Sequence, residues 1–324
     1  MMNSNEILKL INDYLDHIRY DRKPEGLYEP IKYVLSLGGK RIRPTLMLLA
    51  YNMFKDDPQS ILPSACALET YHNYTLLHDD LMDNADLRRG HMTVHKRWNA
   101  NTAILSGDSM LVLAFEQMAQ CREDKFKEIH TLFTRTALEI GEGQQYDMEF
   151  ENRNDVAEDE YIEMIRLKTS VLLACATKMG AILADAPVED AEKLYQFGEK
   201  IGLAFQLQDD FLDVYGDTKV FGKAIGGDII SNKKTYMLIN ALALADERQK
   251  SVLQYWLDMP DPDPQEKIAA VTEIYNEIGI NTLANDKIQS YFQEGMLLLD
   301  AVKVSEDRKQ EMLAYTREMM KREF

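Results

Sequence analysis

The distribution of proline constrains the fold of this chain more than any other feature of its sequence. No proline lies between Pro63 and Pro187, or between Pro187 and Pro260. In these stretches apolar residues recur at the ~3.6-residue period of an α-helix, which leaves little room for strands. The pattern predicts an all-α fold. The predicted helices span residues 4–20, 25–37, 44–54, 63–83, 93–121, 125–150, 159–184, 189–214, 233–247, 249–258, 265–278, 281–301 and 306–321.

The sequence shows no clear boundary between domains. The proline-rich segment 259–264 is a loop, but it is too short to establish a linker. The 324 residues, of which 45% are hydrophobic, are enough to bury a large core. We therefore predict a single all-helical domain over residues 1–324, with the C-terminal helices packed on the same body.

Composition excludes several classes of function. A net charge of −17 argues against nucleic acid as a partner, because its binding needs a basic face. Cys66, Cys121 and Cys175 lie far apart in apolar helical segments, as expected for buried thiols in a reducing compartment. No signal segment opens the chain, and no uncharged run approaches the ~18 apolar residues of a membrane span. These features predict a soluble, cytoplasmic protein.

Three aspartates at the end of the predicted helix 63–83 form the first candidate site. Asp79 and Asp83 are four residues apart and share one face of a helix, with Asp80 on its flank. Three like charges on one turn repel one another unless a cation lies between them, and Mg²⁺ prefers such oxygen ligands. Arg88 and Arg89 follow within two turns, so the segment suits a metal-bridged phosphate. A solvated acidic face is the alternative.

The same aspartate spacing recurs much later in the chain, at Asp209, Asp210 and Asp213. Here too the aspartates follow an apolar helical segment, and recurrence of both features is difficult to attribute to chance. Two such helices could face each other across a cavity and hold several metal ions between them. The predicted fold is therefore a large helical bundle around a central cavity, with two facing aspartate-rich helices.

A basic turn over residues 38–44 precedes the first triad. It is either a helix end followed by a basic turn or a phosphate cradle. In the cradle, two glycines would let the backbone approach while Lys40 and Arg43 supply the charge. His72 lies two helical turns before Asp79 and on nearly the same face, where a structural histidine is the alternative.

Two further segments place lysine beside residues that disturb a helix. Lys168 lies in mid-helix, where it could simply reach solvent from an amphipathic face. Thr169 and Ser170 can bend that helix by hydrogen bonding to the preceding turn, which could aim Lys168 inward. Glycines between residues 216 and 227 predict a flexible loop, which could close over a bound phosphate or be an ordinary surface loop.

Taken together, these motifs resemble the trans-prenyltransferases, which are the farnesyl and geranylgeranyl diphosphate synthases and their longer-chain relatives. The similarity covers residues 38–44, 79–90, 168–169, 205–213 and 222–234, in the order of the family. The flanking helices match only in length and helical character. As a set the motifs are highly specific, although no single one would be.

The resemblance implies that the aspartates bind three Mg²⁺ ions per active site and bridge them to the diphosphate of an allylic substrate. The direct ligands would be Asp79, Asp83 and Asp209. The supporting carboxylates would be Asp80, Asp210 and Asp213. The cations that bind the same diphosphate would be Arg88, Lys168, Lys223 and Lys233.

The resemblance also implies a site for a second substrate, isopentenyl diphosphate. Thr169 and Gln206 would lie near the reacting carbons, and Gln144 with Asp147 matches a further family motif. The residues that bind the second diphosphate would be Lys40, Arg43, His72 and Arg89.

Two positions depart from the family pattern. Met92 stands where proline is common, and Asn99 stands after Trp98 where glycine is usual. Both lie outside the groups that carry chemistry, so they affect the expected loop geometry rather than the expected activity.

The implied reaction is ionisation of the allylic diphosphate, attack by the double bond of isopentenyl diphosphate, and loss of a proton. Metal ions and cationic side chains would stabilise the departing diphosphate. Backbone carbonyls, the Thr169 oxygen and the Gln206 amide oxygen could stabilise the cation, while apolar helices exclude water. The departing diphosphate could itself accept the proton, so no separate base is required.

Residues just before the first triad help to set product length in this family. Tyr74 and Thr75 precede Asp79 by five and four residues, an arrangement that resembles the short-chain enzymes. Both the fifteen-carbon farnesyl and the twenty-carbon geranylgeranyl products stay open. Thr75 projects close to the face of Asp79, whereas Tyr74 lies ~140° around the helix.

The family is generally homodimeric, so the resemblance implies a homodimer. Two other functions are compatible with parts of the pattern. A class I terpene cyclase shares the first aspartate motif, but its second motif usually differs and it needs no site for a second diphosphate. An inactive or regulatory subunit of a heteromeric prenyl synthase would share the fold, although both triads are intact here.

Overall fold

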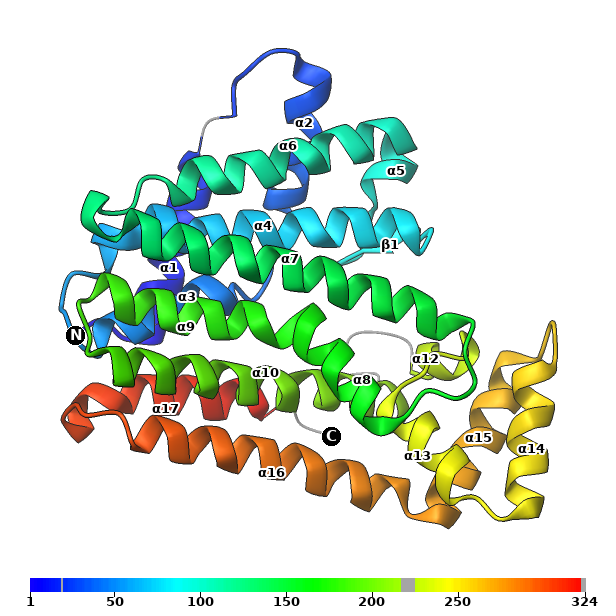
Figure 1. Cartoon of the computed structure of the whole chain (residues 1–324). Helices are drawn as coiled ribbons and strands as arrows, with labels where there is room; N and C mark the ends of the chain where they lie inside the picture. Colours follow the sequence, from blue (N-terminus) through cyan, green and yellow to red (C-terminus); the bar gives the residue numbers. More distant parts are fainter. Residues whose placement is uncertain (19, 217–224, 322–324) are drawn as a thin grey trace. The chain divides into compact units, whose positions relative to one another are not determined.

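The structure is a computed structural model that describes residues 1–18, 20–216 and 225–321 (Figure 1). In these ranges nearly all regular structure is helical, and the strands form a single two-stranded hairpin. The all-α prediction is therefore confirmed. None of the helices within the described ranges combines the length and apolar character needed to cross a membrane.

The chain divides into two compact units. The first unit comprises Met1–Thr134, Cys175–Leu194 and Lys303–Met312. The second unit comprises Arg135–Ala174, Tyr195–Val302 and Leu313–Phe324. The first aspartate triad belongs to the first unit and the second triad to the second unit. The single domain predicted from the sequence stays a prediction.

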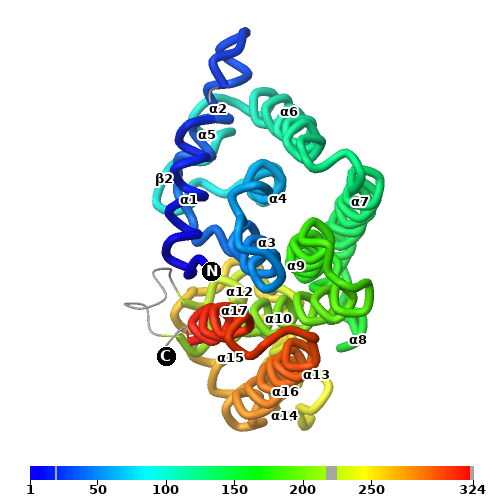
Figure 2. The backbone as a smooth tube through the Cα atoms, turned by 90° about the vertical axis from the view of Figure 1, so that its left-hand side faces the viewer, coloured from blue at the N-terminus to red at the C-terminus, as the bar shows by residue number. Residues whose placement is uncertain are grey.

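Helix α4 is the centre of the first unit. It lies inside a ring of helices that includes α1, α3, α5 and α6 (Figure 2). Every residue from Ser64 to Tyr71 is buried, because neighbours cover this stretch on all sides. The helices and strands of this unit are α1 (Ser4–His17), α2 (Glu25–Ser36), α3 (Ile42–Asn52), η1 (Pro58–Ile61), α4 (Leu62–Met82), β1 (Leu87–Arg88), β2 (His91–Met92), α5 (Val94–Arg97), α6 (Ala100–Met118) and η2 (Glu123–Lys125), with parts of α7 (Phe126–Glu151), α9 (Val171–Leu183), α10 (Val188–Tyr215) and α17 (Glu306–Met320).

Helix α13 has the corresponding place in the second unit. Its residues from Tyr236 to Ala241 are all buried, and it packs against α8, α15 and α16. Leu203, Leu207 and Phe211 of α10 join the same core. The second unit contains the remaining parts of α7, α9, α10 and α17, together with α8 (Glu158–Ile165), η3 (Arg166–Ser170), α12 (Gly227–Ile230), α13 (Tyr236–Leu244), α14 (Glu247–Asp258), α15 (Pro264–Ile278) and α16 (Ile280–Asp300).

Most predicted helices agree with the structure to within a few residues, but three are divided or shortened. The predicted helix 93–121 forms α5 and α6, because the extended Asn99 caps α6 by accepting a hydrogen bond from the Thr102 N–H. The predicted helix 159–184 is interrupted by a π-helical turn, η3. The predicted helix 233–247 begins later, with α13, and the short α12 before it was not predicted.

Candidate active site

The first triad lies at the C-terminal end of α4. Asp79 and Asp80 occupy the last turn, and Asp83 is the capping residue, whose N–H donates to the Asp79 carbonyl oxygen at 2.8 Å. The backbone of Asp83 keeps helical dihedral angles (φ −79°, ψ −3°), so the predicted shared face of Asp79 and Asp83 is retained. Asp79 is half-buried and Asp83 is exposed.

Asp80 is held by an arginine of its own unit. Its side chain is 5% exposed, and Arg88 donates to Oδ1 from Nε at 2.9 Å and from Nη2 at 2.5 Å. Burial raises the pKa of the Asp80 carboxyl, and Arg88 opposes that change. Arg88, expected to bind the allylic diphosphate, therefore pairs with the supporting carboxylate of the triad.

The segment after the triad is a short hairpin. Strands β1 and β2 pair antiparallel, with Arg88 opposite His91. Arg89 and Gly90 form the two-residue turn with φ of 53° and 77°, the conformation that suits a tight hairpin. The hairpin projects Arg89 from its tip.

Arg89 and the basic turn 38–44 lie against each other. A Cβ atom added to Gly39 would lie 2.9 Å from Arg89 Nη2, so a larger residue there would displace the guanidinium, and the φ of +142° at this position also favours glycine. Arg89 Nη1 donates to the Gly38 carbonyl oxygen. The glycines therefore admit an arginine of the hairpin, a role that the sequence alone did not indicate.

Arg43, His72 and Arg89 form a basic cluster in the first unit. Arg43 Nε is buried and has no hydrogen-bond partner among the described residues. Burial lowers the pKa of Arg43 to about 10, with Glu69 opposing and Arg89 reinforcing the change. The pKa of His72 lies well below 6.5, first because of burial and then because of Arg43 and Arg89. An anion would relieve this repulsion and satisfy the open donor. Lys40 lies exposed in the same turn.

Arg41, in the same basic turn, has a structural role that sequence reasoning missed. Its Nη1 donates to Glu69 Oε1 at 2.8 Å and its Nη2 donates to the Leu35 carbonyl oxygen at 3.1 Å. Both Arg41 and Glu69 are buried. No spacing rule separates this arginine from Arg43, because the left-handed backbone at Arg41 decides which one turns into the core.

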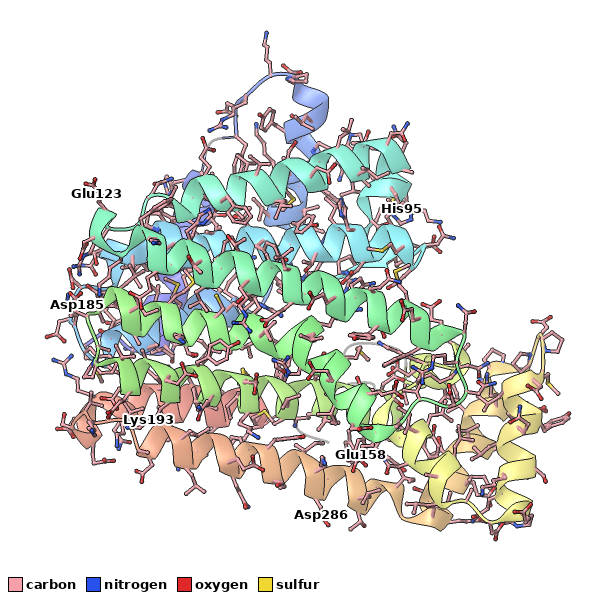
Figure 3. The ribbon with its side chains drawn as sticks, in the orientation of Figure 1. His95, Glu123, Glu158, Asp185, Lys193 and Asp286 are labelled. Carbon is pink, nitrogen blue, oxygen red and sulfur yellow. The ribbon has the colours of Figure 1, made fainter. Side chains whose placement is uncertain are left out.

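His95 is a second residue that the sequence analysis did not single out. It lies on α5 (Figure 3), and both ring nitrogens are buried with no hydrogen-bond partner among the described residues. A protonated His95 would lower the pKa of Asp80, which places the ring near the first triad.

In the second triad, Asp210 has both oxygens engaged. Tyr161 donates its hydroxyl proton to Oδ2, and Gln206 Nε2 donates to Oδ1 at 2.9 Å. Burial raises the pKa of Asp210, while Lys233, Tyr161 and Gln206 oppose that change. Asp209, one residue earlier on α10, is half-buried.

Asp213 fixes the segment that follows α10. Its Oδ2 accepts a hydrogen bond from the Asp228 N–H at 2.8 Å, and its carbonyl oxygen accepts one from the Gly226 N–H at 2.6 Å. Each predicted supporting carboxylate is thus bound by donors of its own unit. Lys223 lies outside the described residues.

The π-helical turn η3 brings together the other predicted residues of the second unit. Lys168 Nζ donates to Asp147 Oδ2 at 2.6 Å, and Thr169 Oγ1 donates to Gln206 Oε1 at 3.0 Å. Burial would raise the pKa of Asp147, but Lys233 and Lys168 outweigh it and the pKa is lowered. Gln144 Oε1 is buried without a hydrogen-bond partner in the described part of the chain.

Two glycines allow η3 to fit between helices. A Cβ at Gly143 on α7 would lie 2.3 Å from the Lys168 backbone nitrogen. A Cβ at Gly202 on α10 would lie 2.6 Å from Ser170 Cα. The predicted bend at Lys168 is therefore a wider turn that needs backbone-to-backbone contact on both sides.

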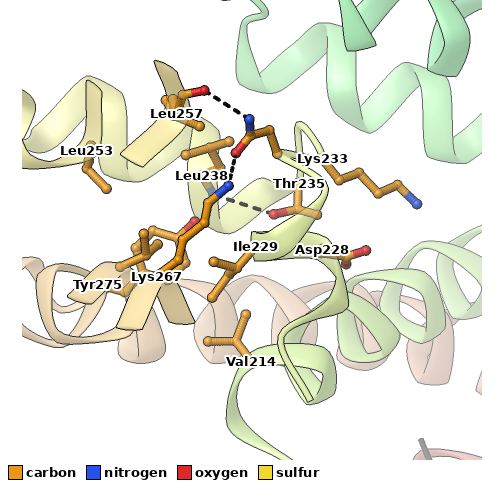
Figure 4. Close-up of a pocket in the computed structure, with 12 residues that line it drawn as sticks. Val214, Asp228, Ile229, Lys233, Thr235, Leu238, Leu253, Leu257, Lys267 and Tyr275 are labelled. Carbon is orange, nitrogen blue, oxygen red and sulfur yellow. Dashed lines mark hydrogen bonds between the residues drawn. The ribbon is translucent and has the colours of Figure 1, made fainter. Parts of the chain in front are cut away.

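The segment before Lys233 is held by hydrogen bonds of Lys267 and Asn232, here called the polar clamp. Lys267 Nζ donates to Asn232 Oδ1 at 2.5 Å and to the Ile230 carbonyl oxygen at 3.1 Å, while Asn232 Nδ2 donates to the Leu257 carbonyl oxygen at 3.1 Å. Figure 4 shows the Lys233 side chain pointing away from this clamp. Its charge acts instead on Asp147 and Asp210.

Tyr74 and Thr75, the predicted product-length residues, lie differently on α4. The Tyr74 ring is half-buried, with its centroid 5.4 Å from that of Tyr71 and 4.9 Å from that of His78. It packs on the core that includes Met110 of α6. Thr75 Oγ1 donates back to the His72 carbonyl oxygen at 2.8 Å. Tyr74 therefore packs towards α6.

The donor set suits a hard divalent cation, although no His, Cys, Asp or Glu side chains within the described ranges gather in groups of three or more that could hold one. Asp79 and Asp83 offer carboxylates on one helical face, with Asp83 exposed to solvent. Asp80, Asp210 and Asp213 are already bound by protein donors.

Comparison with known proteins identifies the family and the relatives of this chain. Residues 24–278 match the polyprenyl synthetase family. A short chain isoprenyl diphosphate synthase of Methanocaldococcus jannaschii is 44% identical over 254 residues, 78% of this chain and 77% of its own. A geranylgeranyl diphosphate synthase of Methanosarcina mazei is 38% identical over 291 residues, 89% of this chain and 88% of its own. A crystal structure of a geranylgeranyl pyrophosphate synthase superposes with a TM-score of 0.94 at 40% identity, covering 100% of both chains.

An all-helical fold with paired aspartate triads and basic partners defines a class of enzymes that transfer prenyl groups. The chain belongs to the polyprenyl synthetase family and is a short-chain prenyltransferase.

Proposed function

We propose that the chain condenses isopentenyl diphosphate with an allylic diphosphate, that aspartates of its two triads hold three Mg²⁺ ions, and that the chain is a single domain. The observation that carries this proposal is the basic cluster of Arg43, His72 and Arg89, with the open donor at Arg43 Nε. A buried guanidinium nitrogen whose hydrogen has no acceptor is costly unless an anion completes it. A second diphosphate is the anion that this chemistry requires.

Asp79, Asp83 and Asp209 would hold the metal ions, as the resemblance to the family implies, with Asp80, Asp210 and Asp213 as supporting carboxylates. Mg²⁺ bound there would supply Lewis acidity that stabilises the leaving diphosphate. Lys168, Lys233 and, outside the described residues, Lys223 add positive charge on the same diphosphate. These fixed charges favour the state in which the carbon–oxygen bond has separated.

The residues of η3 and α10 act on the carbon side of that bond. Thr169 and Gln206 form one hydrogen-bonded pair, so their oxygens are held at fixed positions. Isopentenyl diphosphate, bound at Arg43, His72 and Arg89, would present its double bond to the allylic cation. The released diphosphate would then accept the proton.

The rival functions differ in how they use the second diphosphate. A class I cyclase releases diphosphate from an allylic substrate without isopentenyl diphosphate, a synthase requires both substrates, and an inactive subunit releases none. The test measures diphosphate release with Mg²⁺ or chelator, in the presence and absence of isopentenyl diphosphate. We expect release that depends on both; release without isopentenyl diphosphate, or no release, would overturn the proposal.

We also propose that geranylgeranyl diphosphate is the main product. Two similar proteins are named as synthases of this product, and the half-buried Tyr74 next to α6 supports a short chain. Chromatography of products from dimethylallyl, geranyl and farnesyl diphosphate should give a dominant twenty-carbon chain. A dominant fifteen-carbon product would favour farnesyl diphosphate instead.

We further propose that the protein is cytoplasmic and that it forms a homodimer through α6. On this helix Ile104, Leu105 and Val112 are 44%, 59% and 67% exposed, a large apolar face for a surface helix. Light scattering should show a dimer for the wild type, and Val112→Glu should yield a monomer. A monomeric wild type would rule out this assembly.

A further inference from the structure

A chain of three hydrogen bonds links Tyr161 to Thr169 within the second unit. Tyr161 donates to Asp210 Oδ2, Gln206 Nε2 donates to Asp210 Oδ1 at 2.9 Å, and Thr169 Oγ1 donates to Gln206 Oε1 at 3.0 Å. Tyr161 is 1% exposed and Asp210 is 4% exposed. This series of hydrogen bonds joins α8, α10 and η3. It begins at Tyr161, to which the proposed function gives no role.

The direction of each bond follows from the residue at its centre. An ionised carboxylate only accepts hydrogen bonds, so both groups that meet Asp210 must donate. Gln206 therefore turns its NH₂ group to Asp210 and its oxygen to Thr169. Thr169 has one hydroxyl proton and gives it to Gln206, which leaves the lone pairs of its oxygen free to face elsewhere.

This direction matters for the reaction of the proposed function. Lone pairs stabilise an allylic cation, whereas the positive end of an O–H group destabilises it. If the Gln206 amide were reversed, its NH₂ group would donate to Thr169. The Thr169 proton would then be free to point at the cation.

Tyr161 holds Asp210 in place for this arrangement. Without its hydroxyl, Oδ2 would be a buried anionic atom that has lost its donor, which is unfavourable. The carboxylate could turn towards the positive charge of Lys233, which already acts on it. Gln206 would then lose the partner that orients its amide.

We propose that Tyr161 is a positioning residue for prenyl transfer, which acts through Asp210 and Gln206 to direct the lone pairs of Thr169 at the reacting carbons. The proposal rests on the proposed function, since it concerns the cation formed there. Because Tyr161 is 1% exposed, it would act in this role without contacting either substrate.

The first test compares Tyr161→Phe with a matched control. Tyr236→Phe removes a hydroxyl from a neighbouring ring whose centroid is 6.4 Å away, which is 2% exposed and makes no hydrogen bond to the described aspartates of the second triad. We expect Tyr161→Phe to lower kcat roughly ten- to hundredfold, with KM for both substrates within about twofold of wild type. We expect Tyr236→Phe to change kcat by less than about twofold. Equal kcat in both variants would overturn the proposal.

A double-mutant cycle tests whether Tyr161 acts through Thr169. Thr169→Val removes the hydroxyl that the chain directs, whereas Thr169→Ser keeps it and should retain most of the activity. If Tyr161 acts through the Thr169 hydroxyl, both changes remove the same interaction. The double variant Tyr161→Phe, Thr169→Val should then be no slower than Thr169→Val alone. Losses that multiply would show that Tyr161 affects catalysis by another route, or only by general destabilisation.

A crystal structure of Tyr161→Phe gives a readout that does not depend on turnover. We expect Gln206 Nε2 to move beyond hydrogen-bond distance of Asp210, about 3.5 Å. An unchanged Gln206 would overturn the proposal even if kcat fell. A wild type that makes no condensation product would instead refute the proposed function, so the two failures are distinguishable.

Discussion

The two aspartate triads have the same spacing, but their surroundings differ in kind. In the first unit a guanidinium, that of Arg88, holds the central aspartate, Asp80. In the second unit two neutral groups, the Tyr161 hydroxyl and the Gln206 amide, hold the corresponding Asp210. The third aspartate also differs, because Asp83 caps a helix and is exposed, whereas Asp213 binds the backbone of the next segment.

The cations near each triad differ in the same way. Beyond Arg88, the first unit provides the arginines of the basic cluster, Arg43 and Arg89, whose planar forks match a phosphate group. The second unit provides Lys168 and Lys233, which act as point charges near Asp147 and Asp210. This difference teaches that the same aspartate spacing can stand in two different electrostatic settings. Under the proposed function, the first unit would recognise a diphosphate by shape and the second would stabilise charge as a bond breaks.

The largest expected effect tests what the triads share. Asp79→Ala and Asp209→Ala should each lower kcat by several powers of ten, because each removes a proposed direct metal ligand. Circular dichroism should show that the helices survive in both. Addition of a chelator to the wild type should reproduce the loss. Near-normal turnover in either variant would contradict the assignment for that triad.

The second prediction compares how tightly each region is packed. Gly143→Ala should lower the free energy of unfolding by about 3 kcal/mol, because its Cβ would meet the backbone of Lys168 in η3. Gly107→Ala in the first unit should cost about 1 kcal/mol, since its Cβ meets the His78 side chain, which can move.

Gly141→Ala is the matched control on α7, where nothing lies within 4 Å of the added Cβ. It should stabilise the protein by up to ~1 kcal/mol, as expected for glycine in an exposed helix. Urea unfolding of the three variants gives the order. Equal losses for Gly143 and Gly141 would show that η3 tolerates a wider spacing.

The third prediction separates the two diphosphates. Arg43→Gln should raise KM for isopentenyl diphosphate about ten- to hundredfold and leave KM for the allylic substrate nearly unchanged, because one charged donor is lost. Lys168→Gln should do the opposite, with a further loss in kcat. Steady-state kinetics with each substrate varied in turn measures both. A rise in both KM values for Arg43→Gln would contradict the division between the units.

A pH dependence of stability is expected from the first unit. The pKa of His72 is well below its usual value of 6.5 in the folded protein, because of burial and nearby arginines. At pH values between the folded-state pKa of His72 and its unfolded-state pKa of about 6.5, only the unfolded state binds the proton. The free energy of unfolding therefore falls as the pH decreases below about 6.5, and His72 does not change it above that pH. His72→Gln should remove this slope, at most ~1.4 kcal/mol per pH unit for one proton. Urea unfolding across this range measures it, and an unchanged slope would show that other groups carry it.

The smallest expected effect concerns product length. Tyr74→Ala should lengthen the main product while changing kcat by less than about tenfold, because a half-buried ring beside α6 is removed. Thr75→Ala is the control, since the Thr75 hydroxyl is bound to its own helix. Chromatography of the products distinguishes them. An unchanged distribution in Tyr74→Ala would place the limit to chain growth elsewhere.

The helical fold was largely predictable from local sequence signals. Helix-period apolar residues without proline define the long helices, and aspartates four residues apart on such a helix must share a face. The breaks were less predictable. Asn99 ends one helix and caps the next, and η3 widens a helix whose sequence has ordinary helical spacing, because contacts with Gly143 and Gly202 decide its path.

The candidate site was predictable in its members but not in their partners. Sequence motifs identified both triads and the basic turn and selected Arg43 for the anion, yet they did not indicate that Arg41 pairs with the buried Glu69. They also missed Tyr161, which lies far from Asp210 in the chain and contacts it only because α8 and α10 pack together. Hydrogen bonds between distant segments leave no local pattern for a sequence rule to detect.

What the sequence by itself determined was the helical class, the two carboxylate triads and the cations near them, because these depend on composition and on spacing along a helix. Only the tertiary structure decided which donors Asp80, Asp210 and Asp213 receive, and that Arg43 Nε is buried without a hydrogen-bond partner among the described residues. Those outcomes depend on burial and on donor geometry, since a charge removed from water must find its partner among whatever residues the packing brings near.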